Sequence, residues 1–282
     1  MTIRQPVAAG HFYPADAREL GRQVRAYLGP QARERKRAFA VMAPHAGYVY
    51  SGALAGLALG GMELAQNVII LCPNHTGLGQ PLGVWPDGAW LTPLGQLPVN
   101  DMLARDLIKS GGGFAADTQS HLREHSIEVL LPFLQLAADG QPLKIVPACV
   151  GTARRKSLRA AGEALARVLA MPQWRESTSL VISSDMNHYE DLATTSAKDQ
   201  LALDKLAAGD ADGLLDAVAA ERISMCGAAP AALALYAARG FGNVRGEVVA
   251  HDTSASASGD SSRVVGYAAA RLFAGEDAQA AL

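Results

Sequence analysis

The chain has 282 residues, of which 49% are hydrophobic and 18% charged, and its formal net charge is −2 at pH 7. This length and apolar fraction allow one large domain or two small ones with a substantial buried core. The near-neutral charge balance argues against a nucleic-acid partner, because nucleic-acid-binding proteins present a basic face. No apolar run approaches the ~20 residues that span a bilayer, so no membrane partner is expected.

The N-terminal sequence MTIRQPVAAGHFYP lacks the apolar stretch of a signal peptide. The three cysteines, Cys72, Cys149 and Cys226, are odd in number and far apart. They suit free thiols in a reducing compartment better than a disulfide framework. We therefore expect a cytoplasmic protein.

Short runs rich in Val and Ile alternate with longer helical patterns along the chain. Each run is bounded by Pro, Gly, Asn or Ser, which is typical of strands buried on both faces of a largely parallel sheet. Strands are predicted within residues 38–48, 67–75, 143–151, 179–188, 246–252 and 262–273, and helices over 16–28, 126–137, 154–169, 197–207, 213–219 and 230–238.

No composition break divides the chain, so we predict a single domain over residues 1–282. Its fold class is α/β, with three layers: a central, mostly parallel or mixed sheet and helices on both faces. The last residues, 277–282, are expected to fray.

Polar side chains gather where the strand-like runs end. His45 follows the first run and His75 the second, each with Pro just before and Gly soon after, while Asp185 and His188 follow the fourth. In open α/β sheets, ligands bind outside the carboxyl ends of the strands, so these side chains are expected to converge there. The alternative for any one of these histidines is an ordinary loop residue.

Cys226 lies just before the helical run that contains Pro230. A thiol at a helix N-terminus experiences the positive end of the dipole, which lowers its pKa and favours the thiolate. A thiolate can bind a metal or attack an electrophile. The alternative is a small buried hydrophobe beneath the helix.

His125 and Glu128 are three residues apart, so on a helix they would share one face. A carboxylate beside a histidine can set its tautomer and orientation. The alternative is a helix-start pair that faces solvent. His121, nearby, is expected to be a surface or loop residue.

Several motifs in one order resemble the Memo family, which is related in fold to the class III extradiol dioxygenases. The resemblance covers nearly the whole chain, through AGHFYPAD, APHAGYVYSG, PNHTG, TPLGQLPV, EHSIEVLLPF, SSDMNHY, MCG and SSRVVGYAAA. Two departures are His11, where a Ser is frequent in the family, and CPNHTG in place of a Ser-His form.

The resemblance implies a class III extradiol dioxygenase-like fold and a metal held by His45, His75 and Cys226. It places Asp185 and His188 in the same pocket. Because an imidazole changes its charge near neutral pH, we predict catalytic roles for His188 as acid/base and for Asp185. The resemblance further implies that the side chains lining the pocket or supporting the ligands include His125, Glu128 and Tyr48. Radical-SAM and AMMECR-type proteins are the protein partners that it suggests.

Three functions are compatible with these residues. The first is a dioxygenase-like oxidoreductase that uses Fe(II) and a small aromatic substrate, although a thiolate ligand also suits copper or zinc. The second is a non-catalytic metal-, ligand- or peptide-binding protein with a vestigial pocket. The third is a thiol enzyme with Cys226 as nucleophile and His188 as base.

Overall fold

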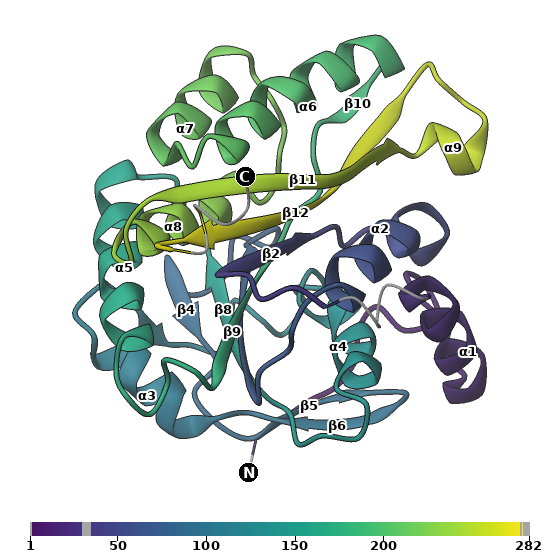
Figure 1. The fold of residues 1–282 in the computed structure, drawn as a ribbon. Helices are drawn as coiled ribbons and strands as arrows, with labels where there is room; N and C mark the ends of the chain where they lie inside the picture. The colour runs from purple at the N-terminus through teal and green to yellow at the C-terminus, as the bar shows by residue number, and fades with distance from the viewer. Residues whose placement is uncertain (1, 30–34, 277, 279–282) are drawn as a thin grey trace.

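The computed structural model describes residues 2–29, 35–276 and 278. Within them, nine strands form one mixed sheet (Figure 1). Their spatial order is β10 (His188–Glu190), β12 (Val264–Ala274), β2 (Ala40–Ala43), β9 (Thr178–Ser183), β3 (Asn67–Pro73), β8 (Lys144–Val150), β4 (Leu82–Val84) and β7 (Ala115–Ala116), while β11 (Val244–Thr253) pairs with β12.

The centre of the sheet is parallel and its flanks are not. Strands β2, β9, β3 and β8 run parallel to one another, whereas β12 is antiparallel to β2 and β4 is antiparallel to β8. All six predicted strands are present. The mixed sheet confirms the predicted fold class.

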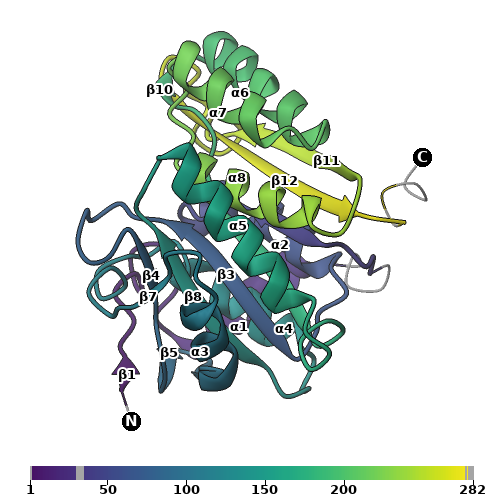
Figure 2. The same cartoon turned by 90° about the vertical axis from the view of Figure 1, so that its left-hand side faces the viewer.

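Side chains alternate between two cores because successive strand residues point to opposite faces. Met42 and Ile69 face one core, and Val41 and Val68 face the other. The first core is covered by α3 (Asp101–Lys109), α5 (Arg155–Leu169), α6 (Leu192–Ala207), α7 (Ala211–Ala220) and α8 (Ala228–Arg239), and the second by α1 (Ala17–Leu28), α2 (Tyr48–Gly60) and α4 (Leu131–Ala137). Figure 2 shows α5 and α8 side by side on the first face.

Helix α2 was not expected from the sequence, because it is apolar all round and rich in glycine. Its glycines lie against α1: a Cβ on Gly52 would come within 2.5 Å of the Tyr27 ring, and one on Gly56 within 2.3 Å of the Tyr27 carbonyl oxygen. The missing side chains therefore let the two helices touch, and α2 is held in place directly after the first strand end.

The helix predicted over residues 126–137 begins later than expected. A short 3₁₀ turn, η2 (Glu128–Leu130), leads into α4, and His125 lies before both. His125 and Glu128 therefore do not share a helical face. This part of the prediction is wrong because the chain at residues 120–127 follows side-chain hydrogen bonds rather than a helical repeat.

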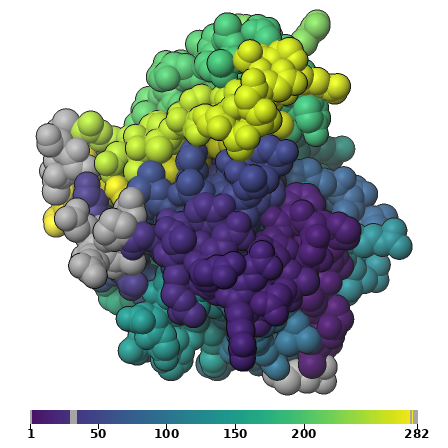
Figure 3. All heavy atoms as spheres, turned by 90° about the vertical axis from the view of Figure 1, so that its right-hand side faces the viewer, coloured from purple at the N-terminus to yellow at the C-terminus, as the bar shows by residue number. Residues whose placement is uncertain are grey.

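Short elements complete the fold. A small sheet is formed by β1 (Ile3–Arg4), β5 (Ala89–Thr92) and β6 (Gly95–Pro98), and α9 (Ala255–Ser258) follows β11. Figure 3 shows the N-terminal part of the chain (purple) at the centre of one face of the molecule, with the C-terminal part (yellow) above it. Most of residues 277–282, where fraying is expected, lie outside the described residues. No helix in the described ranges is long and apolar enough to cross a membrane.

Candidate metal site

Three polar side chains occupy equivalent positions at the carboxyl ends of neighbouring parallel strands. His45, His75 and Asp185 each lie two residues beyond the last residue of their strand, which is β2, β3 and β9 respectively. Since β9 pairs with both β2 and β3, the three strand ends meet at one edge of the sheet. The convergence predicted from the strand ends is present.

A third histidine, His125, joins His45 and His75 in what we call the histidine cluster. One ring nitrogen of each lies within 4.8 Å of the others. The ring centroids of His45 and His75 are 5.4 Å apart, and those of His75 and His125 are 5.1 Å apart. Such a cluster can hold a metal ion. The family resemblance implies a place for His125 beside the pocket and not among the ligands.

The tautomer of His45 follows from its hydrogen bonds. Its Nδ1 lies 2.7 Å from the hydroxyl oxygen of Ser183, and that hydroxyl donates its own hydrogen to the carbonyl of Ser126 at 2.7 Å. The hydroxyl can therefore only accept from His45, so Nδ1 carries the proton. The lone pair of His45 is on Nε2, the atom that faces the cluster.

Glu124 fixes His75 in the same way. One carboxylate oxygen accepts from the ring Nδ1 of His75 at 2.8 Å and the other accepts from its backbone amide at 2.7 Å. An ionised carboxylate only accepts, so Nδ1 of His75 carries the proton and Nε2 is left free. Nδ1 of His125 lies 3.5 Å from the same carboxylate. Glu124 was missed in the sequence, although it stands next to His125 in the EHSIE motif.

Cys226 lies beside the histidine cluster. Its Sγ is 3.5 Å from Nε2 of His45 and accepts a hydrogen bond from the backbone amide of Asp185 at 3.2 Å. The carboxylate of Asp185 accepts from the His45 amide at 2.8 Å, and its other oxygen lies 3.9 Å from Nε2 of His45. Sulfur and carboxylate thus both approach the nitrogen that His45 presents.

Burial governs the charges of the site. Burial, with the neighbouring His75, lowers the pKa of His45 to about 3, and burial, with His45, lowers the pKa of His125 to about 4. Both imidazoles are neutral at pH 7, the form that binds metals. Burial opposes the charged form of His75, but Glu124 outweighs it and raises the pKa of His75. Burial would raise the pKa of Glu124, but the hydrogen bonds from His75 lower it to about 2.

The thiol of Cys226 does not have the lowered pKa expected from its sequence position. It precedes Gly227, the N-cap of α8, yet burial and then the charge of Asp185 raise its pKa well above the ordinary value. The helix dipole is outweighed because the thiol is enclosed beside a carboxylate. This argues against Cys226 as a free nucleophile, whereas a coordinated metal deprotonates a thiol outright.

His188 lies at the border of the site. Its backbone amide donates to the Ser224 hydroxyl at 2.7 Å, and its charge is close enough to lower the pKa of His45. Its Nδ1 is buried and has no hydrogen-bond partner among the described residues. His188 therefore keeps one ring nitrogen uncommitted beside the histidine cluster.

The structure does not bring Glu128 or Tyr48 into the histidine cluster. The Glu128 carboxylate accepts from the side chains of Arg4 and Tyr13, both at 2.6 Å. The Tyr48 hydroxyl donates to the carbonyl of Val129 at 2.8 Å. Both residues hold the N-terminal segment and α2 against the turn that bears His125.

His121 is also placed differently from expectation. It is fully buried, with its ring 5.7 Å from that of Trp90 and its Nε2 3.0 Å from the carbonyl of Gly83. Burial lowers the pKa of His121 to about 4. His121 lies in the loop between β7 and η2, as one of the two alternatives expected, but it is a neutral buried residue and does not lie at the surface.

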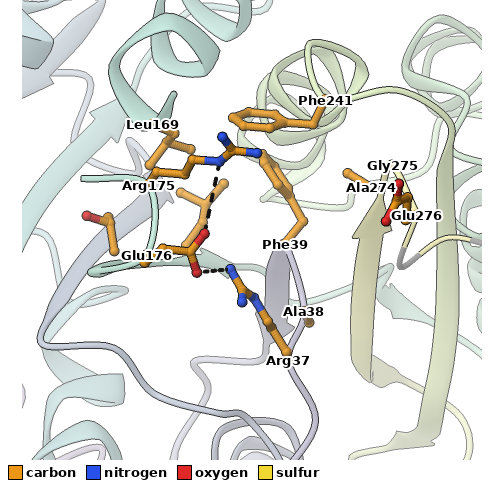
Figure 4. A pocket seen from close by; sticks show the side chains of 12 residues that line it. Arg37, Ala38, Phe39, Leu169, Arg175, Glu176, Phe241, Ala274, Gly275 and Glu276 are labelled. Carbon is orange, nitrogen blue, oxygen red and sulfur yellow. Dashed lines mark hydrogen bonds and ion pairs between the residues drawn. The ribbon is translucent and has the colours of Figure 1, made fainter. Parts of the chain in front are cut away.

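A separate hollow of about 570 Å³ lies at the opposite end of the sheet, where β2 and β9 begin (Figure 4). Phe39 and Phe241 form part of its wall, and Glu176 at its mouth pairs with Arg37 and Arg175. Its described lining residues include no His or Cys. It is therefore distinct from the candidate metal site.

Fold and site together define an α/β protein with a histidine cluster at the carboxyl edge of its sheet. The family model described as Memo-like protein matches residues 4–271. The chain is 40% identical to a MEMO1 family protein of Thermotoga neapolitana, over 96% of this chain and 99% of that protein. It is 35% identical to one of Aquifex aeolicus, over 95% and 98%. The chain belongs to the Memo family.

A solved structure supports the fold. The crystal structure of an uncharacterized protein from Escherichia coli K12 aligns with a TM-score of 0.55, covering 82% of this chain and 98% of that one. The sequence identity is 14%, so the likeness concerns the fold alone.

Proposed function

We propose that this chain binds one Fe(II) ion at the histidine cluster and acts as a dioxygenase-like oxidoreductase on a small aromatic or similarly planar substrate. The observation that carries the proposal is the orientation of the imidazoles. The Nδ1 atoms of His45 and His75 are held by Ser183 and Glu124, which leaves both Nε2 atoms available as ligands, and one ring nitrogen of each histidine in the cluster lies within 4.8 Å of the others. Imidazole suits iron, copper, zinc and nickel.

The cluster is closed on one side and open on the other. The His45 side chain is 2% exposed, whereas those of His75 and His125 are 36% and 25% exposed. A metal held there would face solvent on the side of His75 and His125. Open coordination positions distinguish catalytic sites from structural ones, which are fully enclosed by protein ligands. This asymmetry supports a site that admits a substrate.

Bound Fe(II) would supply a redox-active centre with exchangeable positions for substrate and O2. The chain's own contribution is proton handling and orientation. The His188 imidazole, whose backbone amide is held by Ser224, would accept a proton from a substrate hydroxyl. Asp185, whose carboxylate accepts a hydrogen bond from the backbone amide of His45, would orient the groups that lie beside His45.

A second candidate is a non-catalytic metal- or ligand-binding protein that holds copper or zinc. The observation that favours it is the thiol of Cys226, 3.5 Å from Nε2 of His45, because a soft sulfur ligand suits Cu(I) and zinc. Radical-SAM and AMMECR-type partners, and a cytoplasmic location, stay predictions from the sequence.

Metal analysis after anaerobic purification tests the proposal. We expect about one iron per chain, lost in His45→Ala, His75→Ala and His125→Ala and weakened in Cys226→Ser, because each change removes a candidate ligand. His11→Ala, an exposed histidine outside the cluster, is the control. Full metal content in all three alanine variants would overturn the site. O2 uptake with a panel of catechols separates the two candidates, since only the enzyme consumes O2.

A further inference from the structure

Two segments that carry candidate site residues touch each other closely. Residues 184–187 follow β9 and include Asp185, and residues 222–227 precede α8 and include Cys226. A Cβ on Gly227 would lie 2.2 Å from Cβ of Ser184, so only glycine permits this approach. The position of the Cys226 thiol therefore depends on how these two segments are joined.

Asn187 joins them. Its side-chain oxygen accepts from both the backbone amide and the hydroxyl of Ser224, each at 3.0 Å, and its side-chain nitrogen donates to Glu190 at 2.6 Å. The Ser224 hydroxyl also accepts from the backbone amide of His188 at 2.7 Å. Asn187 is fully buried, while Ser224 is exposed. One asparagine thus ties the segment of Asp185 and His188 to the segment of Cys226.

Asp199 on α6 fixes the backbone of Asn187 through a hydrogen bond. Asp199 is fully buried. One of its carboxylate oxygens accepts a hydrogen bond from the backbone amide of Asn187 at 2.8 Å, and the other lies 2.7 Å from Nε2 of His251. A Cβ on Gly266 of β12 would lie 1.8 Å from this carboxylate, so the strand leaves room for it. Asn187 is therefore fixed by α6 and β12, independently of the histidine cluster.

We propose that Asn187 and Ser224 are positioning residues that set the place of the Cys226 sulfur relative to the histidine cluster. The inference rests on the proposed metal site. Neither residue contacts the cluster, so breaking their link moves the sulfur while the imidazoles and their own supports stay in place. Breaking the link between Asn187 and Ser224 should therefore weaken the contact between sulfur and metal, and leave the contacts between the histidines and the metal in place.

Titration with Co(II) alone tests this, because a sulfur-to-cobalt charge-transfer band reports whether Cys226 binds the metal. We expect a band in the parent that is absent in Cys226→Ser. Ser224→Ala weakens the band and lowers Co(II) affinity roughly tenfold, in line with the loss of other supporting groups around metals. Ser224→Thr keeps the hydroxyl and restores both. Ser177→Ala, at a half-buried serine just before β9 and outside this link, is the control.

Asn187→Ala is expected to lower Co(II) affinity by about 10- to 100-fold. If this variant does not fold, Ser224→Ala decides, because its side chain is exposed. A cysteine-dependent band in the parent that is unchanged in Ser224→Ala overturns the inference and leaves the proposed function standing. A parent without Co(II) binding overturns the proposed function, and one that binds without a cysteine-dependent band overturns the role of Cys226.

Discussion

Glu124 accepts hydrogen bonds from both the backbone amide and the ring Nδ1 of His75, at 2.7 and 2.8 Å. One carboxylate therefore fixes the loop and the tautomer of a candidate ligand at the same time. Its own backbone carbonyl accepts from the Arg4 guanidinium at 2.6 Å. The site is thus supported by a chain of contacts that reaches the N-terminal segment.

Glu124→Gln keeps the shape of this side chain and removes its charge. We expect metal affinity to fall by roughly 10- to 100-fold, because a carboxylate that orients a histidine ligand also raises its basicity. Competition with a chelator measures the change. Glu163→Gln, on the exposed side of α5, should bind metal like the parent. Equal affinity in the two variants would show that Glu124 does not support the site.

Ser183→Ala removes the acceptor that fixes His45. Without the hydroxyl oxygen 2.7 Å from Nδ1, the proton is free to move to Nε2, the atom that faces the cluster. We expect nitrogen NMR of the metal-free protein to show a larger Nε2–H population and metal affinity to fall roughly tenfold. Ser177→Ala, just before the same strand, is the control. An unchanged His45 tautomer would contradict the prediction.

The strand ends were predictable because buried parallel strands carry a strong apolar signal. His45, His75 and Asp185 each stand two residues past such a run, and the sheet brings them to one edge. Their spacing in sequence carries no metal motif. The sheet topology, and not any local pattern, unites them.

The supporting residues were not predictable in the same way. Glu124 and His125 lie in a stretch without periodicity, where side-chain hydrogen bonds determine the path of the chain. Glu128 was assigned to the pocket, but its partner Arg4 is 124 residues away in sequence, and no local pattern indicates that pairing. The raised pKa of Cys226 likewise comes from burial and Asp185, both products of tertiary structure.

Arg4→Met tests the buried ion pair beneath the site. Arg4 and Glu128 are 1% and 0% exposed and 2.6 Å apart. Removing one charge leaves the other buried and uncompensated, so we expect unfolding free energy to fall by about 3–5 kcal/mol. Denaturant unfolding measures this. Arg105→Met, which breaks the exposed pair with Asp101 at 3.5 Å, should change stability by less than about 0.5 kcal/mol. Similar losses in both variants would refute the distinction.

Gly56→Ala tests why α2 is rich in glycine. Alanine favours a helix over glycine by about 1 kcal/mol, so propensity alone predicts a more stable protein. A Cβ at this position, however, would lie 2.3 Å from the carbonyl oxygen of Tyr27, and that backbone atom can move only if α1 moves. We expect the overpacking to outweigh the propensity and to lower unfolding free energy by about 1–3 kcal/mol.

The matched control for this change is Gly21→Ala on α1. A Cβ there would meet the flexible end of Arg25 at 3.4 Å and Leu94 at 3.7 Å, which are ordinary contacts or nearly so. The same substitution should therefore be neutral or stabilising by up to about 1 kcal/mol. Opposite signs for the two variants in one unfolding assay would establish close contact between α1 and α2. A stabilised Gly56→Ala protein would mean that the helices lie farther apart than this structure places them.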